Sequence, residues 1–126
     1  MNLAFLLVLI ALLQYLWFSS KVGLKRGEYG VKAPATIGNE SWERLYRVQQ
    51  NTLEQMIIFI PAVLAFAFYS GIWAMIPGGL YLIGRQVYSM GYLKDPSKRG
   101  PGMLMTLIAN VVLILGALVG VIKALV

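Results

Sequence analysis

Two rows of polar side chains interrupt a chain that is otherwise rich in apolar residues. Steps of three, four and three residues separate the members of the first row, so a helix would carry them on one face. This row consists of Arg44, Arg47, Asn51 and Glu54. Guanidinium groups bind carboxylates through paired hydrogen bonds, and a carboxylate can bind an ammonium group. The row therefore predicts one wall of a binding site for a small charged molecule.

The second row has steps of four, three and four residues and consists of Tyr81, Arg85, Tyr88 and Tyr92. An arginine at membrane depth costs about 2.5 kcal/mol or more, so Arg85 needs a partner. Glu54 lies at a comparable depth, and we expect the two side chains to pair. Such a pair would either fix helix packing only or belong to a site, and the two residues alone leave both interpretations open.

Composition restricts the class of protein. The chain has 126 residues, of which 59% are hydrophobic and 13% charged, and its mean hydropathy is +0.72. A soluble domain carries about a quarter charged residues, so these values indicate a helical membrane protein. The absence of Cys and His excludes a thiol nucleophile, a disulfide framework and the usual metal sites, so we expect no metal. Membrane topology explains the net charge of +6, and no nucleic-acid partner is expected.

Four apolar segments predict a single all-α domain over residues 1–126, an integral membrane four-helix bundle. The expected helices span residues 2–25, 41–70, 73–93 and 101–124, and Asn39 or Ser41 is expected to cap the second. The first and third loops are basic and the second is uncharged. The positive-inside rule therefore places loops one and three in the cytoplasm and both termini on the non-cytoplasmic side. In a bacterium this would be the inner membrane.

Both polar rows and both basic loops fall at the same end of the expected bundle. Cations outnumber carboxylates there, which favours an anion with several hydrogen-bonding groups. The residues gathered at this end are Lys25, Arg26, Arg44, Arg47, Arg85 and Arg99, near Gln49, Asn51, Tyr88 and Tyr92. For Lys21, Lys32 and Lys98, the simpler interpretation is that they set topology and touch lipid headgroups.

Three of these stretches resemble one family. Residues 43–54, Glu-Arg-Leu-Tyr-Arg-Val-Gln-Gln-Asn-Thr-Leu-Glu, are similar to the signature of the membrane-associated proteins in eicosanoid and glutathione metabolism (MAPEG). Residues 84–92 resemble the helix-three motif of that family, and residues 96–99 its third loop. Order and spacing agree over about residues 20 to 102, and residues 50–54 look closest to the type 3 microsomal glutathione transferases.

The resemblance implies a homotrimer that binds glutathione between neighbouring subunits near the cytosolic face. By position, it implies that Arg99 faces the thiol and that Arg26 contacts the electrophile or acts as an acid. Gln55 departs from an aromatic residue of the synthase branch, and Lys25 stands where that branch has an arginine. The implied glutathione ligands are Arg47, Gln49, Asn51, Glu54, Tyr88, Tyr92 and Lys25, with supporting roles for Arg44, Arg85 and Tyr81.

The implied function is a membrane-bound glutathione transferase that joins the thiolate to hydrophobic electrophiles, with peroxidase activity on lipid hydroperoxides as an option. Glutathione is then the co-substrate, and the other partners are membrane lipid and a hydrophobic small molecule. Two alternatives remain open. One is a non-catalytic lipid-binding or adaptor protein on the same fold. The other is a small four-helix transporter, which the collection of polar residues at one end makes less favourable.

Overall fold

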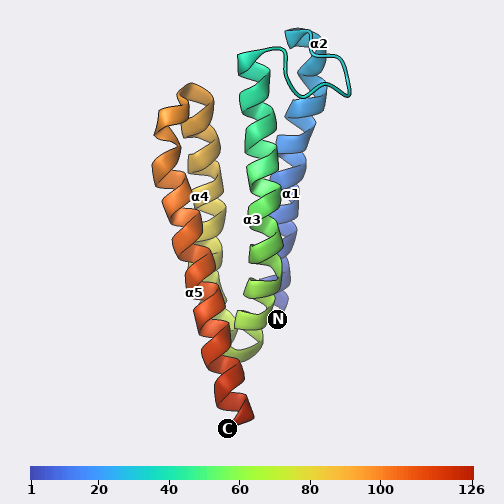
Figure 1. The fold of residues 1–126 in the computed structure, drawn as a ribbon. Coiled ribbons are helices and arrows are strands. Elements are labelled where there is room, and N and C mark those ends of the chain that lie inside the picture. The colour runs from blue at the N-terminus through green and yellow to red at the C-terminus, as the bar shows by residue number, and fades with distance from the viewer.

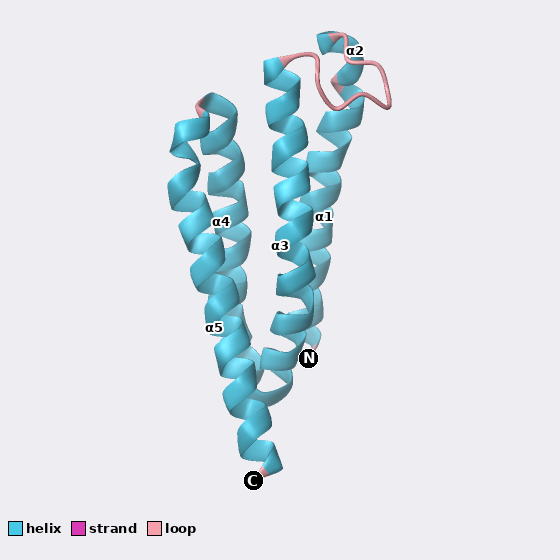
Figure 2. Ribbon diagram, viewed as in Figure 1, coloured by secondary structure: helices cyan, strands magenta, loops and turns pink.

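The computed structural model describes residues 1–126 and is all-helical (Figures 1 and 2), which confirms the predicted helical class. Four helices of 20 residues or more make up most of the chain. A short helix and two 3-10 turns lie in the connections. In chain order the elements are α1 (Asn2–Leu24), α2 (Arg26–Tyr29), α3 (Glu40–Ser70), η1 (Gly71–Ala74), α4 (Met75–Lys94), η2 (Pro96–Arg99) and α5 (Gly100–Leu125).

The long helices run side by side, with α1 against α3 and α4 against α5. Both termini lie at the end opposite α2 (Figure 1). Three stretches are long and apolar enough to cross a membrane: Asn2–Leu24, Glu40–Lys94 and Pro96–Leu125. The second stretch contains α3, η1 and α4, because the turn between the two helices is itself helical.

Local sequence explains where α3 begins and ends. The Asn39 side chain accepts a hydrogen bond from the Trp42 N–H at 3.0 Å and caps the helix, as one of the two expected caps. Gly71 closes the helix with a φ of 56°, a left-handed value that glycine adopts without a steric penalty. The 3-10 turn that follows delays the start of α4 to Met75.

Only 28 of the 126 residues are buried, so most apolar side chains face outward. Water would disfavour such a surface, whereas lipid hydrocarbon accepts it. Inside the bundle, Phe59 of α3 stacks on Tyr81 of α4 with ring centroids 3.8 Å apart. At the α2 end, the buried indole of Trp42 donates to the Val22 carbonyl at 2.9 Å and ties α3 to α1.

The helices α4 and α5 approach each other closely at Gly102. A Cβ atom on this glycine would collide with the backbone of Tyr88, which cannot move aside as a flexible side chain could. Gly100, one half-turn earlier, has open space where its Cβ would lie. The close contact places the start of α5 directly against Tyr88.

We expect Gly102→Ala to lower the midpoint of thermal unfolding in detergent, because overpacking costs about 1–3 kcal/mol. Gly100→Ala is the matched control, since it adds the same methyl group in open space of the same helix. An equal midpoint for the two variants would contradict the close packing of α5 on α4.

Candidate functional site

The centre of the polar region is Arg85, which is 1% exposed in the middle of the bundle. Its Nη2 atom donates to Asn51 Oδ1 at 2.6 Å and to Thr52 Oγ1 at 3.0 Å, both on α3. Its Nη1 atom donates to Thr106 Oγ1 of α5 at 3.3 Å. One guanidinium group on α4 therefore links three helices, using the fixed fork of donors that only arginine has.

Two tyrosines extend this cluster toward the loop end. The Arg85 guanidinium lies 4.5 Å from the centre of the Tyr88 ring, and Tyr88 stacks on Tyr92 with centroids 5.6 Å apart. The Tyr88 phenol also lies within electrostatic range of Arg47 and Arg99. The structure thus brings Asn51 of the first predicted row together with Arg85, Tyr88 and Tyr92 of the second.

The expected ion pair between Glu54 and Arg85 is wrong. Both Nη atoms of Arg85 donate to Asn51 and the two threonines, and Glu54 is exposed and forms no ion pair within the chain. A helix turns 100° per residue, which rotates Glu54 about 60° past Asn51 and away from Thr52. Helical spacing places Glu54 on the same broad polar face of α3 as Asn51. The Arg85 guanidinium contacts only the side of that face that carries Asn51 and Thr52.

Arg47 is likewise exposed, and the structure gives it no hydrogen bond or ion pair within the chain. Glu54 lies 16 residues before the end of α3, about 24 Å from that end at 1.5 Å per residue. This depth falls within a hydrocarbon layer of about 30 Å. A charge there needs protein or water rather than lipid beside it.

Two other predicted ligands, Gln49 and Lys25, and the predicted acid or electrophile contact Arg26 bind other groups within the chain. Gln49 donates to Ser19 Oγ at 3.0 Å, across the α1–α3 contact from Asn51. Lys25 pairs with Glu28 at 2.8 Å. Arg26 donates to the Ala35 carbonyl at 2.8 Å. The structure does not bring these three side chains into the cluster around Arg85.

Arg44 and Tyr81, for which supporting roles are expected, contact other helices. Arg44 pairs with Glu40 at 2.8 Å, and its Nη1 atom donates to the carbonyls of Leu93 and Lys94 at 3.3 and 3.4 Å. These carbonyls end α4 and would otherwise lack partners. Tyr81 is fully buried against Phe59 and lies one turn deeper than Arg85.

Sequence reasoning missed Thr52 and Thr106, which are both buried and both bonded to Arg85. Thr52 stands beside Asn51 in the first row, and Thr106 is the first hydroxyl in an apolar helix, four residues after Gly102. A single hydroxyl in an otherwise apolar stretch could have indicated that Thr106 bonds to a buried polar group. A cavity of about 320 Å³ opens here between α3, α4 and α5, lined by Gln55, Arg85, Met103, Leu104, Thr106 and Leu107.

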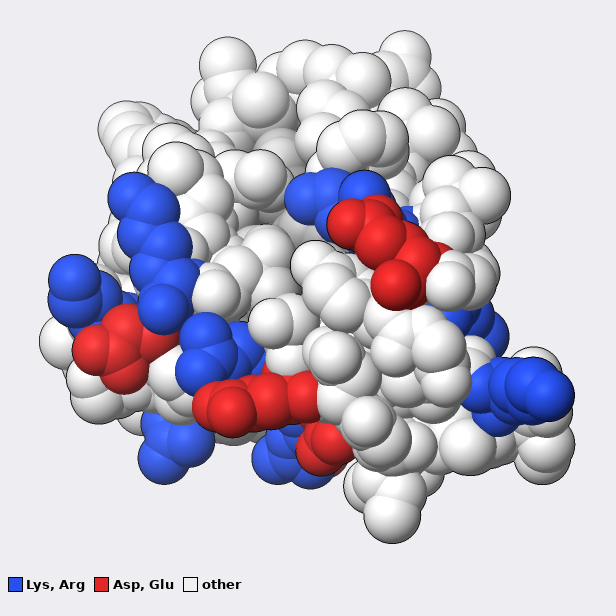
Figure 3. All heavy atoms as spheres, turned by 90° about the horizontal axis from the view of Figure 1, so that it is seen from above, with Lys and Arg blue, Asp and Glu red and all other residues white.

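Charged side chains gather at the loop end, where Figure 3 looks down on the bundle. Arg99 is exposed there and immediately precedes α5, whose first N–H groups carry partial positive charge. Nearby, hydrogen bonds from Ser97 lower the pKa of Asp95, which starts the η2 turn. No group of three or more His, Cys, Asp or Glu side chains is placed to hold a metal ion.

We expect Arg85→Lys to lower the midpoint of thermal unfolding, because one ammonium cannot reach acceptors on both α3 and α5. An unsatisfied buried acceptor costs about 1–3 kcal/mol. Arg47→Lys makes the same chemical change at an exposed position without partners in the chain, and its midpoint should stay at that of the wild type. A midpoint for Arg85→Lys equal to that of Arg47→Lys would refute the linking role.

Comparison with known proteins identifies the family. The MAPEG family model matches residues 3–119. An uncharacterized protein of Synechocystis is 40% identical over 117 residues, which are 92% of this chain and 85% of that protein. Homo sapiens microsomal glutathione S-transferase 2 is 36% identical over 83% of this chain and 73% of its own length. Leukotriene C4 synthase of Bos taurus is 32% identical over 72% of this chain and 61% of its own length. The human transferase is named as type 2, so placement of this chain in the type 3 branch stays a prediction. The chain belongs to the MAPEG family of membrane proteins.

Proposed function

We propose that this chain is a membrane-bound glutathione transferase that conjugates the glutathione thiolate to hydrophobic electrophiles. The observation that carries the proposal is the cluster around Arg85. Asn51 and Tyr88 are held there in fixed positions, with Arg47 and Arg99 in electrostatic range of the same tyrosine. The similarity to enzymes named glutathione S-transferase supports glutathione as the co-substrate.

The side chains match the groups of glutathione. It carries two carboxylates, an ammonium group and a thiol. Arg47 can bind a carboxylate with a fork of two hydrogen bonds, and Glu54 can accept from the ammonium group. Asn51 already accepts from Arg85 through Oδ1, so its amide N–H groups remain to donate to the peptide. Tyr88 and Tyr92 would line the same face.

Arg99 is the proposed catalytic residue. A free thiol has a pKa of about 8.5, so little thiolate exists at neutral pH. A nearby guanidinium favours the anion and lowers such a pKa by about 1–3 units. The N-terminus of α5 adds positive potential at the same place. The thiolate sulfur then attacks the electrophilic carbon, the C–S bond forms, and the electrons leave with the displaced group or pass into the acceptor.

The electrophile would arrive from the bilayer. The cavity of about 320 Å³ beside Arg85 is walled on the α5 side by Met103, Leu104 and Leu107. These side chains suit an apolar molecule, and all three are exposed on the outer face of the helix. The same arrangement of thiolate and apolar mouth would let a lipid hydroperoxide react, so peroxidase activity is included in the proposal.

The site needs more than one copy of the chain. Arg47 and Glu54 have no partners within the chain, yet Glu54 lies at membrane depth, where a lipid-facing charge is costly. Gln49 hydrogen-bonds to Ser19 of α1, away from this cluster, so it would reach this glutathione from a neighbouring copy. Arg26, for which the resemblance implies a contact with the electrophile or a role as an acid, would come from the same neighbouring copy. A homotrimer with glutathione between neighbours satisfies both conditions, and three copies are what the family resemblance implies.

The proposed topology has four membrane crossings within one domain, with α3 and α4 crossing separately. The basic loops before α3 and after α4 would face the cytoplasm, and both termini the opposite side. In a bacterial cell, the chain would lie in the cytoplasmic membrane.

We expect Arg99→Ala to retain glutathione binding by calorimetry but to lose most of the ultraviolet absorbance of the bound thiolate. Conjugation to a chlorinated nitrobenzene should fall about 10–1,000-fold, the rate equivalent of about 1–3 pKa units of lost thiolate stabilisation. Lys98→Ala removes the neighbouring charge and serves as the matched control. Unchanged thiolate absorbance in Arg99→Ala would contradict the role of Arg99, and absence of glutathione binding to the wild type would contradict the proposed function.

The absence of cysteine allows a direct test of topology with single-cysteine variants. In right-side-out membrane vesicles, a membrane-impermeant maleimide should label Ile72→Cys, in the uncharged turn between α3 and α4. Ser97→Cys, in the basic loop, should be labelled only after permeabilisation. Labelling of both variants in sealed vesicles would refute separate crossings by α3 and α4.

A further inference from the structure

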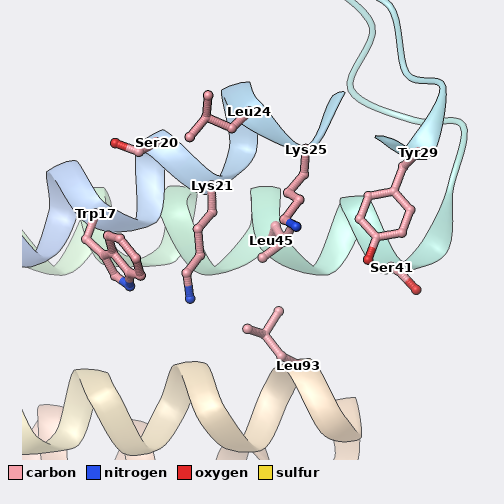
Figure 4. A pocket seen from close by; sticks show the side chains of 9 residues that line it. All are labelled: Trp17, Ser20, Lys21, Leu24, Lys25, Tyr29, Ser41, Leu45 and Leu93. Atoms are coloured by element: carbon pink, nitrogen blue, oxygen red, sulfur yellow. The ribbon is translucent and has the colours of Figure 1, made fainter. Parts of the chain in front are cut away.

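A second hollow opens at the loop end between α1, α3 and α4 (Figure 4). Its volume is about 450 Å³, which is within the range of small-molecule sites. It lies on the opposite face of α3 from the proposed glutathione site. Leu45 lines the hollow, whereas Arg47, two residues later, belongs to the glutathione face. Two positions along a helix are rotated by about 200°, so the two side chains point in nearly opposite directions.

Two lysines give this hollow its charge: Lys21 in α1, and Lys25 immediately after α1. Lys21 and Lys25 are one turn apart, and both side chains extend from α1 on the side that faces α4, with the Lys25 ammonium group beside Leu45 (Figure 4). Lys25 is paired with Glu28 at 2.8 Å, which raises the pKa of the lysine and keeps it protonated. Lys21 has no carboxylate within ion-pair distance. The hollow therefore has an uncompensated positive charge.

The remaining walls combine apolar and aromatic surface. The Lys21 ammonium lies 5.0 Å from the centre of the Trp17 ring, which holds the side chain in place without neutralising it. Leu24, which is 80% exposed, lies at the rim of the hollow, and Leu93 of α4 lies on the far side. Tryptophan is typical of the membrane–water interface, and this end of α1 is where α1 leaves the hydrocarbon layer. A small soluble anion would use the charge only, whereas an amphiphile would use the charge and the apolar walls.

We propose that this hollow binds the phosphate headgroup of an anionic phospholipid beside the ammonium group of Lys21, with Lys25 on the loop side of the phosphate and the acyl chains running past Trp17 toward the hydrocarbon layer. The bound lipid would fill the space between α1 and α4 at the loop end, where the two helices are joined by no hydrogen bond nearer than that of Gln14 with Gln86. It would stabilise the bundle from the side opposite the glutathione site. This assigns Lys25 to lipid rather than to glutathione.

The test titrates the purified full-length protein in detergent with phosphatidylglycerol and records the midpoint of thermal unfolding. A ligand that binds only the folded chain raises this midpoint with concentration. Phosphatidylglycerol should raise it, and phosphatidylcholine with the same acyl chains should have a much smaller effect. In Lys21→Gln, the apparent affinity for phosphatidylglycerol should fall about fivefold, the value of one lysine near an anionic surface. Lys21→Arg should keep most of it.

Lys32→Gln is the matched control, because it removes one exposed charge from the same loop end outside the hollow. Its affinity should match that of the wild type, and unchanged midpoints in phosphatidylcholine show that each variant folds. Equal losses in Lys21→Gln and Lys32→Gln would mean diffuse attraction to lipid and would overturn the proposal. Equal stabilisation by glycerol phosphate would also overturn it, because the ligand would then be a free phosphate.

Discussion

The buried guanidinium of Arg85 is the constraint on which this structure depends. A cation inside a membrane bundle must be surrounded by acceptors, and here these come from α3 and α5 while the arginine comes from α4. The interaction fixes the rotation of three helices about their own axes, since each acceptor must face the same point. It also determines which way Asn51 presents its amide. The polar face and the fold are therefore set by the same hydrogen bonds.

The charges that the bundle leaves without partners are as informative as those it satisfies. Arg44 is used at the end of α4 and Arg26 at the loop before α3, so both have partners within the chain. Arg47 and Glu54 have none, although they lie on the most polar helix. An isolated charge at membrane depth is costly in lipid, so Glu54 needs protein, a ligand or water beside it.

The two faces of α3 would then serve different chemistry. One face, with Asn51 and Arg47, is polar and suits a peptide thiol. The opposite face looks into the hollow beside Lys21 and Trp17, which has both charge and apolar surface. The helix is long enough to do this because α3 extends past the hydrocarbon layer: its 31 residues span about 46 Å against a layer of about 30 Å. Binding on either face would act on the same rigid helix.

Sequence alone determined the helical class, the membership of Arg85 in a polar row and the family, and it reduced the cap of α3 to Asn39 or Ser41, because each depends on composition, local hydrogen bonding or a continuous motif. It did not determine the partner of Arg85: a helical repeat places residues on a face but does not say which of them points at the neighbouring helix. The two glycines Gly116 and Gly120 stand four residues apart, a spacing typical of close helix contacts. In the structure they contact the rings of Phe66 and Tyr69, and it is Gly102 that contacts the backbone of α4. Thr106 and the hollow at Lys21 also emerged only in three dimensions, because each requires the rotation and spacing of helices that are distant in the chain. Helix rotation and helix spacing depend on many weak packing contacts between helices, and these contacts cannot be identified from a single sequence.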